Sequence, residues 1–194
     1  MPGPASMVST AVVLGCSTGG LRALSTLLAG LRPDLAVPVI VVCHRSQDDD
    51  DALFVELLAR HSALPVVEAG EREPALPGRV HVAPSGYHLL LEADGRFMLS
   101  VDPRVRHVRP SVDVLFESAA EVHGAGLLAA ILTGANDDGA DGLLAVRRHR
   151  GYAVVQDPAE AEAPQMPQAA LKHAGADAVI GLIRLAALIN ERCR

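Results

Sequence analysis

Three groups in this sequence have the chemistry of an acyl-transfer site. They are the hydroxyl of Ser17, the imidazole of His44 and the adjacent carboxylates of Asp137 and Asp138. A serine attacks a carbonyl carbon when a histidine takes its proton, and a carboxylate orients that histidine. Ser17 lies in Gly15-Cys16-Ser17-Thr18-Gly19, and this G-x-S-x-G pattern is typical of a nucleophile at a strand-to-helix turn. The order Ser, His, Asp differs from the Ser, Asp, His order of α/β-hydrolases, which argues against an ordinary lipase-type esterase.

Each of these residues also has a simpler interpretation. Ser17 could cap the helix that follows its glycine-rich turn, and Asp137 or Asp138 could cap the next helix. Cys16, Cys43 and His44 could ligate zinc, but their spacing is not that of a zinc site, so we predict no metal. The glycine-rich turn lacks the lysine of a P-loop and the G-x-G-x-x-G pattern of a dinucleotide site.

The elements that must position these side chains follow from the apolar periodicity. Short apolar runs predict buried strands at Thr10–Leu14, Pro38–Cys43, Leu127–Leu132, Ala153–Gln156 and Ala178–Ile180. Apolar residues at helical spacing predict helices between these strands, including those at Leu21–Leu31, Leu53–Leu58, Val112–Ala119 and Ala140–His149. The acidic run Asp48–Asp51 fits the positive end of the second helix. A polar loop is expected up to Pro167, and two helices should flank the last strand.

The middle of the chain has a different pattern. Short strands are predicted at Arg79–Ala83, Tyr87–Glu92 and Arg96–Ser100, with Asp94-Gly95 as a hairpin turn. We therefore expect an α/β fold with a doubly wound, mostly parallel sheet, helices on both faces and a small antiparallel hairpin insert. Residues 10–194 form one domain in this prediction, and residues 1–9 form a flexible tail. Such sheets carry their sites at the carboxyl ends of the strands, where Ser17, His44 and Asp138 stand.

Composition and charge exclude several classes of protein. The chain has 194 residues, of which 49% are hydrophobic and only 3% aromatic, so it is not disordered and cannot stack nucleic-acid bases extensively. The net charge of −6 argues against general nucleic-acid binding. No apolar run is long enough for membrane insertion. Three cysteines without regular spacing favour a reducing compartment, and we expect the protein in the cytoplasm.

Several further motifs make the chain resemble the catalytic domain of the CheB-type chemotaxis methylesterases, from about Val12 to Leu188. The most specific motif is Arg-Pro-Ser-Val-Asp-Val-Leu-Phe at residues 109–116. The others are Gly15-Cys16-Ser17-Thr18-Gly19-Gly20, His44, Leu76-Pro77-Gly78, Val82-Ala83-Pro84, Ile131-Leu132-Thr133-Gly134, Asp138-Gly139-Ala140 and Met166-Pro167.

The resemblance implies an enzyme that hydrolyses γ-glutamyl methyl esters on the cytoplasmic helices of methylated chemoreceptors, releasing methanol, and that deamidates certain glutamines. It assigns Ser17 as nucleophile, His44 as base and acid, and Asp138 as orienting carboxylate, because the family's aspartate directly precedes Gly-Ala. It implies no cofactor. It also implies an oxyanion and substrate-positioning set, namely Thr18, Gly19, Thr133, Gly134, Ala135, Asn136 and Met166.

The sequence departs from the family pattern in and around the predicted site. Cys43-His44-Arg45 replaces the usual Gln-His-Met, Ala135-Asn136 replaces Met-Gly, and Gln165 replaces a glycine. We expect Arg45, with Arg22 and Arg109, to make the mouth of the site positive. The family's receiver domain does not fit into the first residues, which predicts control by a separate regulator. The altered loops leave two alternatives: a non-catalytic module that binds a receptor or kinase, and an esterase for another substrate.

Overall fold

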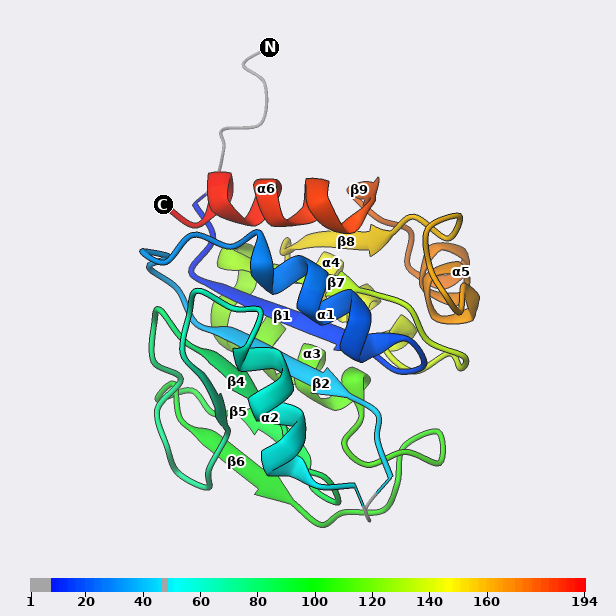
Figure 1. The fold of residues 1–194 in the computed structure, drawn as a ribbon. Coiled ribbons are helices and arrows are strands. Elements are labelled where there is room, and N and C mark those ends of the chain that lie inside the picture. Colours follow the sequence, from blue (N-terminus) through cyan, green and yellow to red (C-terminus); the bar gives the residue numbers. More distant parts are fainter. Residues whose placement is uncertain (1–7, 47–48) are drawn as a thin grey trace.

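The computed structural model describes residues 8–46 and 49–194, so most of the predicted tail and Asp48 of the acidic run lie outside the described residues. Seven parallel strands form one sheet in the order β3-β4-β2-β1-β7-β8-β9 (Figure 1). These strands are β1 (Ala11–Cys16), β2 (Val39–Cys43), β3 (Val66–Glu68), β4 (Val80–Val82), β7 (Leu127–Ile131), β8 (Tyr152–Gln156) and β9 (Ala178–Ile180). A separate antiparallel hairpin pairs β5 (His88–Leu91) with β6 (Phe97–Ser100).

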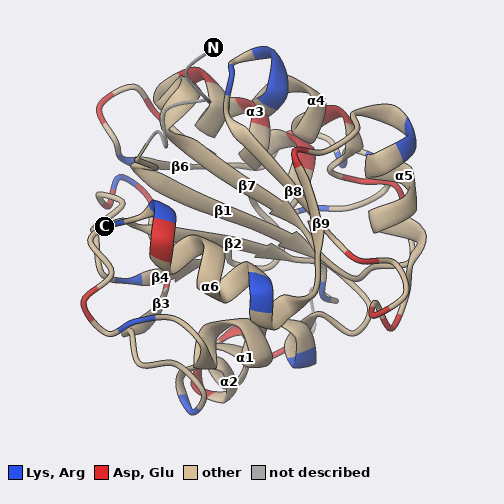
Figure 2. Cartoon of the chain, turned by 90° about the horizontal axis from the view of Figure 1, so that it is seen from above, with Lys and Arg blue, Asp and Glu red and all other residues tan. Residues whose placement is uncertain are grey.

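Helices cover both faces of the sheet, as an apolar sheet without charged central strands requires. One face packs against α1 (Gly20–Ala29), α2 (Asp51–Ala59) and α6 (Leu182–Arg192). The other packs against α3 (Val112–His123), α4 (Ala140–Arg148), α5 (Gln165–His173) and the hairpin, and a short 3₁₀ turn η1 (Gly124–Gly126) follows α3. Figure 2 shows the helices on both sides of the sheet. The Lys, Arg, Asp and Glu residues lie around the sheet, and its centre is uncharged. The predicted fold class is confirmed.

Three predicted elements need correction. The strand predicted at Arg79–Ala83 is β4, which belongs to the parallel sheet between β2 and β3 rather than to the hairpin insert. The edge strand β3 was not predicted at all. Helix α5 begins at Gln165, inside the loop predicted to run to Pro167, because proline is tolerated in the first turn of a helix.

Strands β1, β2 and β7 lie side by side at the centre of the sheet and deliver the candidate residues to one edge. Cys16 is paired in register with Cys43, and Gly15 with Ile131. The ladder continues past the strand ends, because the Ser17 N–H donates to the Thr133 carbonyl at 2.9 Å. No helix within the described residues is long and apolar enough to span a membrane.

Gly15 sets how closely α3 approaches this edge. A Cβ atom at this position would lie 2.3 Å from Cγ1 of Val112, the first residue of α3. Such a separation is far below van der Waals contact, so only glycine lets the start of α3 lie against β1. This close approach brings the N-terminus of α3 to the carboxyl edge of the sheet.

Candidate active site

Ser17 stands in the turn between β1 and α1 and lines a pocket of about 810 Å³ together with His44. The N-cap of α1 is Gly19, in a left-handed conformation with φ of 77°, and no side chain caps the helix. The alternative in which Ser17 acts as a cap is therefore wrong. Its hydroxyl makes no hydrogen bond within residues 8–46 and 49–194, which leaves its oxygen available to the pocket.

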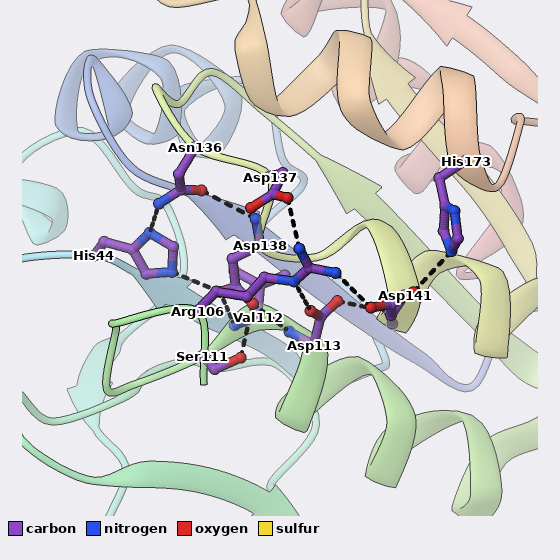
Figure 3. A network of polar contacts seen from close by, with 11 residues as sticks. His44, Arg106, Ser111, Val112, Asp113, Asn136, Asp137, Asp138, Asp141 and His173 are labelled. Atoms are coloured by element: carbon purple, nitrogen blue, oxygen red, sulfur yellow. Dashed lines mark hydrogen bonds and ion pairs between the residues drawn. The ribbon is translucent and has the colours of Figure 1, made fainter. Parts of the chain in front are cut away.

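His44 directly follows β2, and its ring is held by two partners (Figure 3). Nε2 lies 2.7 Å from Oδ2 of Asp138, and the two side chains are only 7% and 0% exposed. On the other side of the ring, Nδ1 lies 3.0 Å from Nδ2 of Asn136. A carboxylate at Nε2 requires the hydrogen of the neutral imidazole to sit on that nitrogen, which leaves the Nδ1 lone pair to act as a base.

Asp138 is a buried carboxylate whose oxygens accept hydrogen bonds from α3. The Ser111 hydroxyl donates at 2.7 Å, and the backbone N–H groups of Val112 and Asp113 donate at 2.6 and 3.2 Å. Burial alone would raise its pKa, but the hydrogen bond and charge of His44, with the α3 donors, hold the pKa of Asp138 below its usual value. Asp138 is not the N-cap of α4, because Gly139 occupies that position. Asp138 is therefore ionised and aimed at His44.

Asn136 contacts both His44 and Asp138. The Asp138 backbone N–H donates to Asn136 Oδ1 at 3.2 Å, which fixes the orientation of the amide. The amide NH₂ therefore faces His44 and donates to Nδ1. Nδ1 is the only ring nitrogen of this tautomer that can accept a proton, so the Asn136 amide occupies the acceptor that a base at His44 would use.

In the two loops around Ser17, the backbone N–H groups of Thr18, Gly19, Ala135 and Asn136 have no acceptor on the backbone of the described residues. The N–H groups of Thr133 and Gly134 cannot serve, because they donate to Gln156 Oε1 at 2.8 Å and to the Ala163 carbonyl at 2.9 Å. Thr133 and Gly134, two residues of the predicted positioning set, therefore anchor the loop after β7 through these hydrogen bonds. Gln156 was missed, although a polar residue ending a buried strand was a usable signal.

Met166 supports the same loop from beneath. Its backbone N–H donates to the Gly134 carbonyl at 2.9 Å, and its side chain is buried. A Cβ at Gly134 would lie 1.9 Å from the Met166 sulfur and 3.0 Å from Cβ of Ser17. Met166 therefore packs against the floor of the loop, and Gly134 is required for the loop to pass between Met166 and Ser17.

Arg106 forms a second polar centre that the sequence pattern did not reveal. Its guanidinium contacts the carboxylates of Asp113, Asp137 and Asp141 at 3.1, 2.5 and 2.5 Å (Figure 3). Asp137 is thereby held away from His44, which is contacted by Asp138. Burial is the main cause that raises the pKa of Asp113 to about 6, with the nearby Asp138 carboxylate adding to the effect.

Arg45 lines the large pocket, as expected for a cation at the mouth of the site, but its guanidinium is largely buried and paired with a carboxylate. Its side chain is 8% exposed, Nη2 lies 2.6 Å from Oδ1 of Asp51, and the guanidinium stacks 4.2 Å from the centre of the Phe54 ring. The acidic run does begin α2 as predicted, because Asp50 is the N-cap and accepts from the Leu53 N–H. Arg22 lines the large pocket.

The three cysteines are buried free thiols. A hydrogen bond to Cys43, with burial, raises the pKa of Cys16 well above its usual value. Across residues 8–46 and 49–194, no cluster of three or more His, Cys, Asp or Glu side chains could hold a metal ion. All three side chains belong to the apolar core on the α1, α2 and α6 face of the sheet.

Comparison with known proteins decides the family. The family model described as CheB methylesterase matches residues 12–189. The chain belongs to the CheB methylesterase family. The crystal structure of the CheB methylesterase catalytic domain of Thermotoga maritima superposes with a TM-score of 0.90 at 31% identity, covering 94% of this chain and 98% of that one.

Relatives of two lengths match this CheB family member. One from Leptospira interrogans is 42% identical over 178 residues, which cover 92% of each chain. The protein-glutamate methylesterase/protein-glutamine glutaminase 1 of Hahella chejuensis is 40% identical over 183 residues, covering 93% of this chain but 50% of that protein. The chain therefore spans nearly all of the first relative and about half of the second.

Proposed function

We propose that this protein is a protein-glutamate methylesterase that hydrolyses γ-glutamyl methyl esters on chemoreceptor helices, releasing methanol, and that it also deamidates glutamine. The observation that carries the proposal is the short contact between His44 and the buried carboxylate of Asp138, beside the unpartnered hydroxyl of Ser17. Family membership supplies the substrate class, since relatives bear the name protein-glutamate methylesterase/protein-glutamine glutaminase.

In the proposed mechanism, Ser17 Oγ attacks the ester carbonyl carbon while its proton moves to His44 Nδ1. Asp138 stabilises the imidazolium that forms, because it accepts from Nε2 and is ionised. The proton is then given to the methoxide as methanol leaves. Water attacks the acyl-enzyme by the same route and releases the glutamate carboxylate and Ser17. With a glutamine substrate, ammonia leaves in the first half instead.

The oxyanion of each tetrahedral intermediate needs N–H donors that do not already have acceptors. Thr18 and Ala135 meet that condition, since neither N–H donates to a carbonyl within the described residues. Thr18 directly follows Ser17, and Ala135 follows Gly134, where a Cβ would lie 3.0 Å from Cβ of Ser17. We assign them as the oxyanion donors. In this proposal Gly19, Thr133, Gly134, Asn136 and Met166 position the turn and the loop that carry them.

The test is methanol release from a methylated receptor cytoplasmic fragment, with wild type compared with Ser17→Ala. The wild-type enzyme should release methanol, and the variant should lose activity by at least three orders of magnitude. Ammonia release from a glutamine-containing fragment measures deamidation in the same way. Equal methanol release by folded Ser17→Ala would contradict the mechanism.

A second candidate is a non-catalytic module of the same fold that binds a receptor or kinase. It is favoured by the Asn136 amide, which occupies the Nδ1 acceptor of His44. Tight binding to the methylated fragment with no methanol release by folded wild type would select it. In both cases the expected partner is the receptor cytoplasmic domain and the expected place is the cytoplasm.

A further inference from the structure

A second, smaller pocket of about 240 Å³ opens beside His44, on a side that Ser17 does not line. Its walls come from the segment after β2 and from the loop before α3. The lining residues include His44, Arg45, Arg104 and Arg109. Among the described residues, those that line this space include three arginines and no Asp or Glu, although the protein as a whole carries a net charge of −6.

The charges of two of these arginines are not compensated. Arg104 and Arg109 form no ion pair with a carboxylate in residues 8–46 and 49–194. Arg104 donates only to the carbonyl of His107, and Arg109 to the carbonyls of Val101 and Asp102. Both guanidinium groups therefore keep their full charge for an anion.

Two of the arginines that line this pocket also carry buried nitrogens without acceptors. Nε and Nη1 of Arg45 and Nε of Arg109 are buried and have no hydrogen-bond partner within the part of the chain that the structure describes. The side chain of Arg45 is more than nine-tenths buried, and its one carboxylate partner, Asp51, binds the remaining nitrogen, Nη2. Unsatisfied buried guanidinium nitrogens are costly, and a carboxylate is the ligand that satisfies them best.

The loop that forms the outer wall is held in one conformation. Val105 and Val108 exchange backbone hydrogen bonds across a tight turn, and Arg106 within that turn is clamped by three carboxylates. The three carboxylates form ion pairs with Arg106 and not with Arg104 or Arg109. The clamp also fixes the loop so that Arg104 and Arg109 border the pocket, which reduces the entropic cost of binding an anion there.

We propose that this basic pocket, lined by Arg45, Arg104 and Arg109, binds an acidic side chain of the substrate helix while Ser17 attacks the methyl ester. This inference rests on the proposed function and adds a rule for substrate choice. Both pockets share His44 and Arg45. A side chain in the basic pocket therefore belongs to a residue near the ester, and on a helix the neighbours on one face lie three or four residues away.

The test uses helical peptides that carry one γ-methyl glutamate and one Glu or Gln placed three or four residues before or after it. At least one Glu position should raise kcat/KM of wild type roughly two- to fivefold over the matched Gln peptide. The preference should act mainly through KM and shrink in high salt. The Arg104→Glu variant should lose the preference for Glu over Gln. It should instead prefer a peptide that carries Lys at the same position.

Arg184→Glu provides a matched control, because Arg184 lies exposed on α6 and the charge change is the same. It should keep the wild-type preference. A small neutral γ-methyl glutamate diamide, which cannot reach the basic pocket, tests folding and chemistry separately, and Arg104→Glu should hydrolyse it at the wild-type rate. If wild type hydrolyses this ester but prefers no Glu peptide, the inference fails while the proposed function stands. If wild type releases methanol neither from this ester nor from any of the methylated peptides, the proposed function fails.

Discussion

Replacing Asp138 by asparagine is the sharpest test of how the site is built. The carboxylate accepts from His44 and Val112 at Oδ2 and from Ser111 and Asp113 at Oδ1. An amide NH₂ group at either position faces a backbone N–H that cannot turn away. At the Oδ2 position it also meets the Nε2–H of His44 and forces the histidine into the wrong tautomer for accepting the Ser17 proton.

The size of both effects follows from these contacts. One orphaned buried N–H costs about 1–3 kcal/mol, and loss of the charge-assisted bonds adds about 1–2 kcal/mol, so stability should fall by about 2–5 kcal/mol. The wrong tautomer lowers kcat by about 10⁴-fold in a serine triad, which corresponds to about 5.4 kcal/mol of transition-state energy. Urea denaturation at pH 7 measures the first quantity, and methanol release under conditions that keep the variant folded measures the second.

Asp137→Asn is the matched control, because the neighbouring carboxylate is more than half exposed and contacts Arg106 rather than His44. It should change stability by less than about 1 kcal/mol and leave kcat within a few-fold of wild type. Because the folded-state pKa of Asp138 lies below its unfolded value of 3.8, the stabilisation it provides is present above that pH and is lost as pH falls further. The stability difference between wild type and Asp138→Asn should therefore narrow in acid. Equal kcat in the two variants, or a larger loss in Asp137→Asn, would refute this account.

Other substitutions and treatments probe separate contacts. Asn136→Gly frees His44 Nδ1 and should raise kcat by about two- to tenfold with little change in KM, measured by methanol release; an unchanged or lower kcat would show that the amide does not compete with Ser17. Protonated Asp113 is favoured in the folded state, so wild type should lose on the order of 2–3 kcal/mol of stability as pH rises from about 4 through about 6, whereas Asp113→Asn should not; parallel denaturation curves at each pH would contradict this. Gly134→Ala should inactivate the enzyme, because its Cβ would collide with Met166, and wild-type methanol release would refute the packing described. Cys16 and Cys193 should resist iodoacetamide at pH 7.5 until urea is added, since both thiols are buried with raised pKa values; mass spectrometry of the folded protein would expose any early labelling.

Much of the fold could be predicted because the central strands are uninterrupted apolar runs that end at residues with chemistry. Ser17 and His44 each follow such a run, and parallel strands bring their carboxyl ends to one edge. Strand β3 escaped prediction because its three residues follow Pro65 and lie at the sheet edge, where periodicity is too short to read. Strand β4 was found, but its partners could not be deduced from so short a run.

The candidate site was harder to predict where it depends on residues distant in sequence. The choice of Asp138 over Asp137 came from the family motif, and its contact with α3 requires the close approach at Gly15. The clamp on Arg106 and the burial of Arg45 have no local pattern, because each depends on which carboxylates folding brings near. Arginine at a strand end predicted a charge at the mouth but not the side chain's direction.

The central place of β1 has a consequence for how this protein is made. The strand is fully buried and pairs with β2 on one side and with β7 on the other, although β7 comes far later in the chain. During synthesis, one edge of an entirely apolar strand must wait unpaired until Leu127–Ile131 has emerged, and such edges recruit other chains. Slow translation or a premature stop before Ile131 should therefore produce aggregates rather than a partly active enzyme.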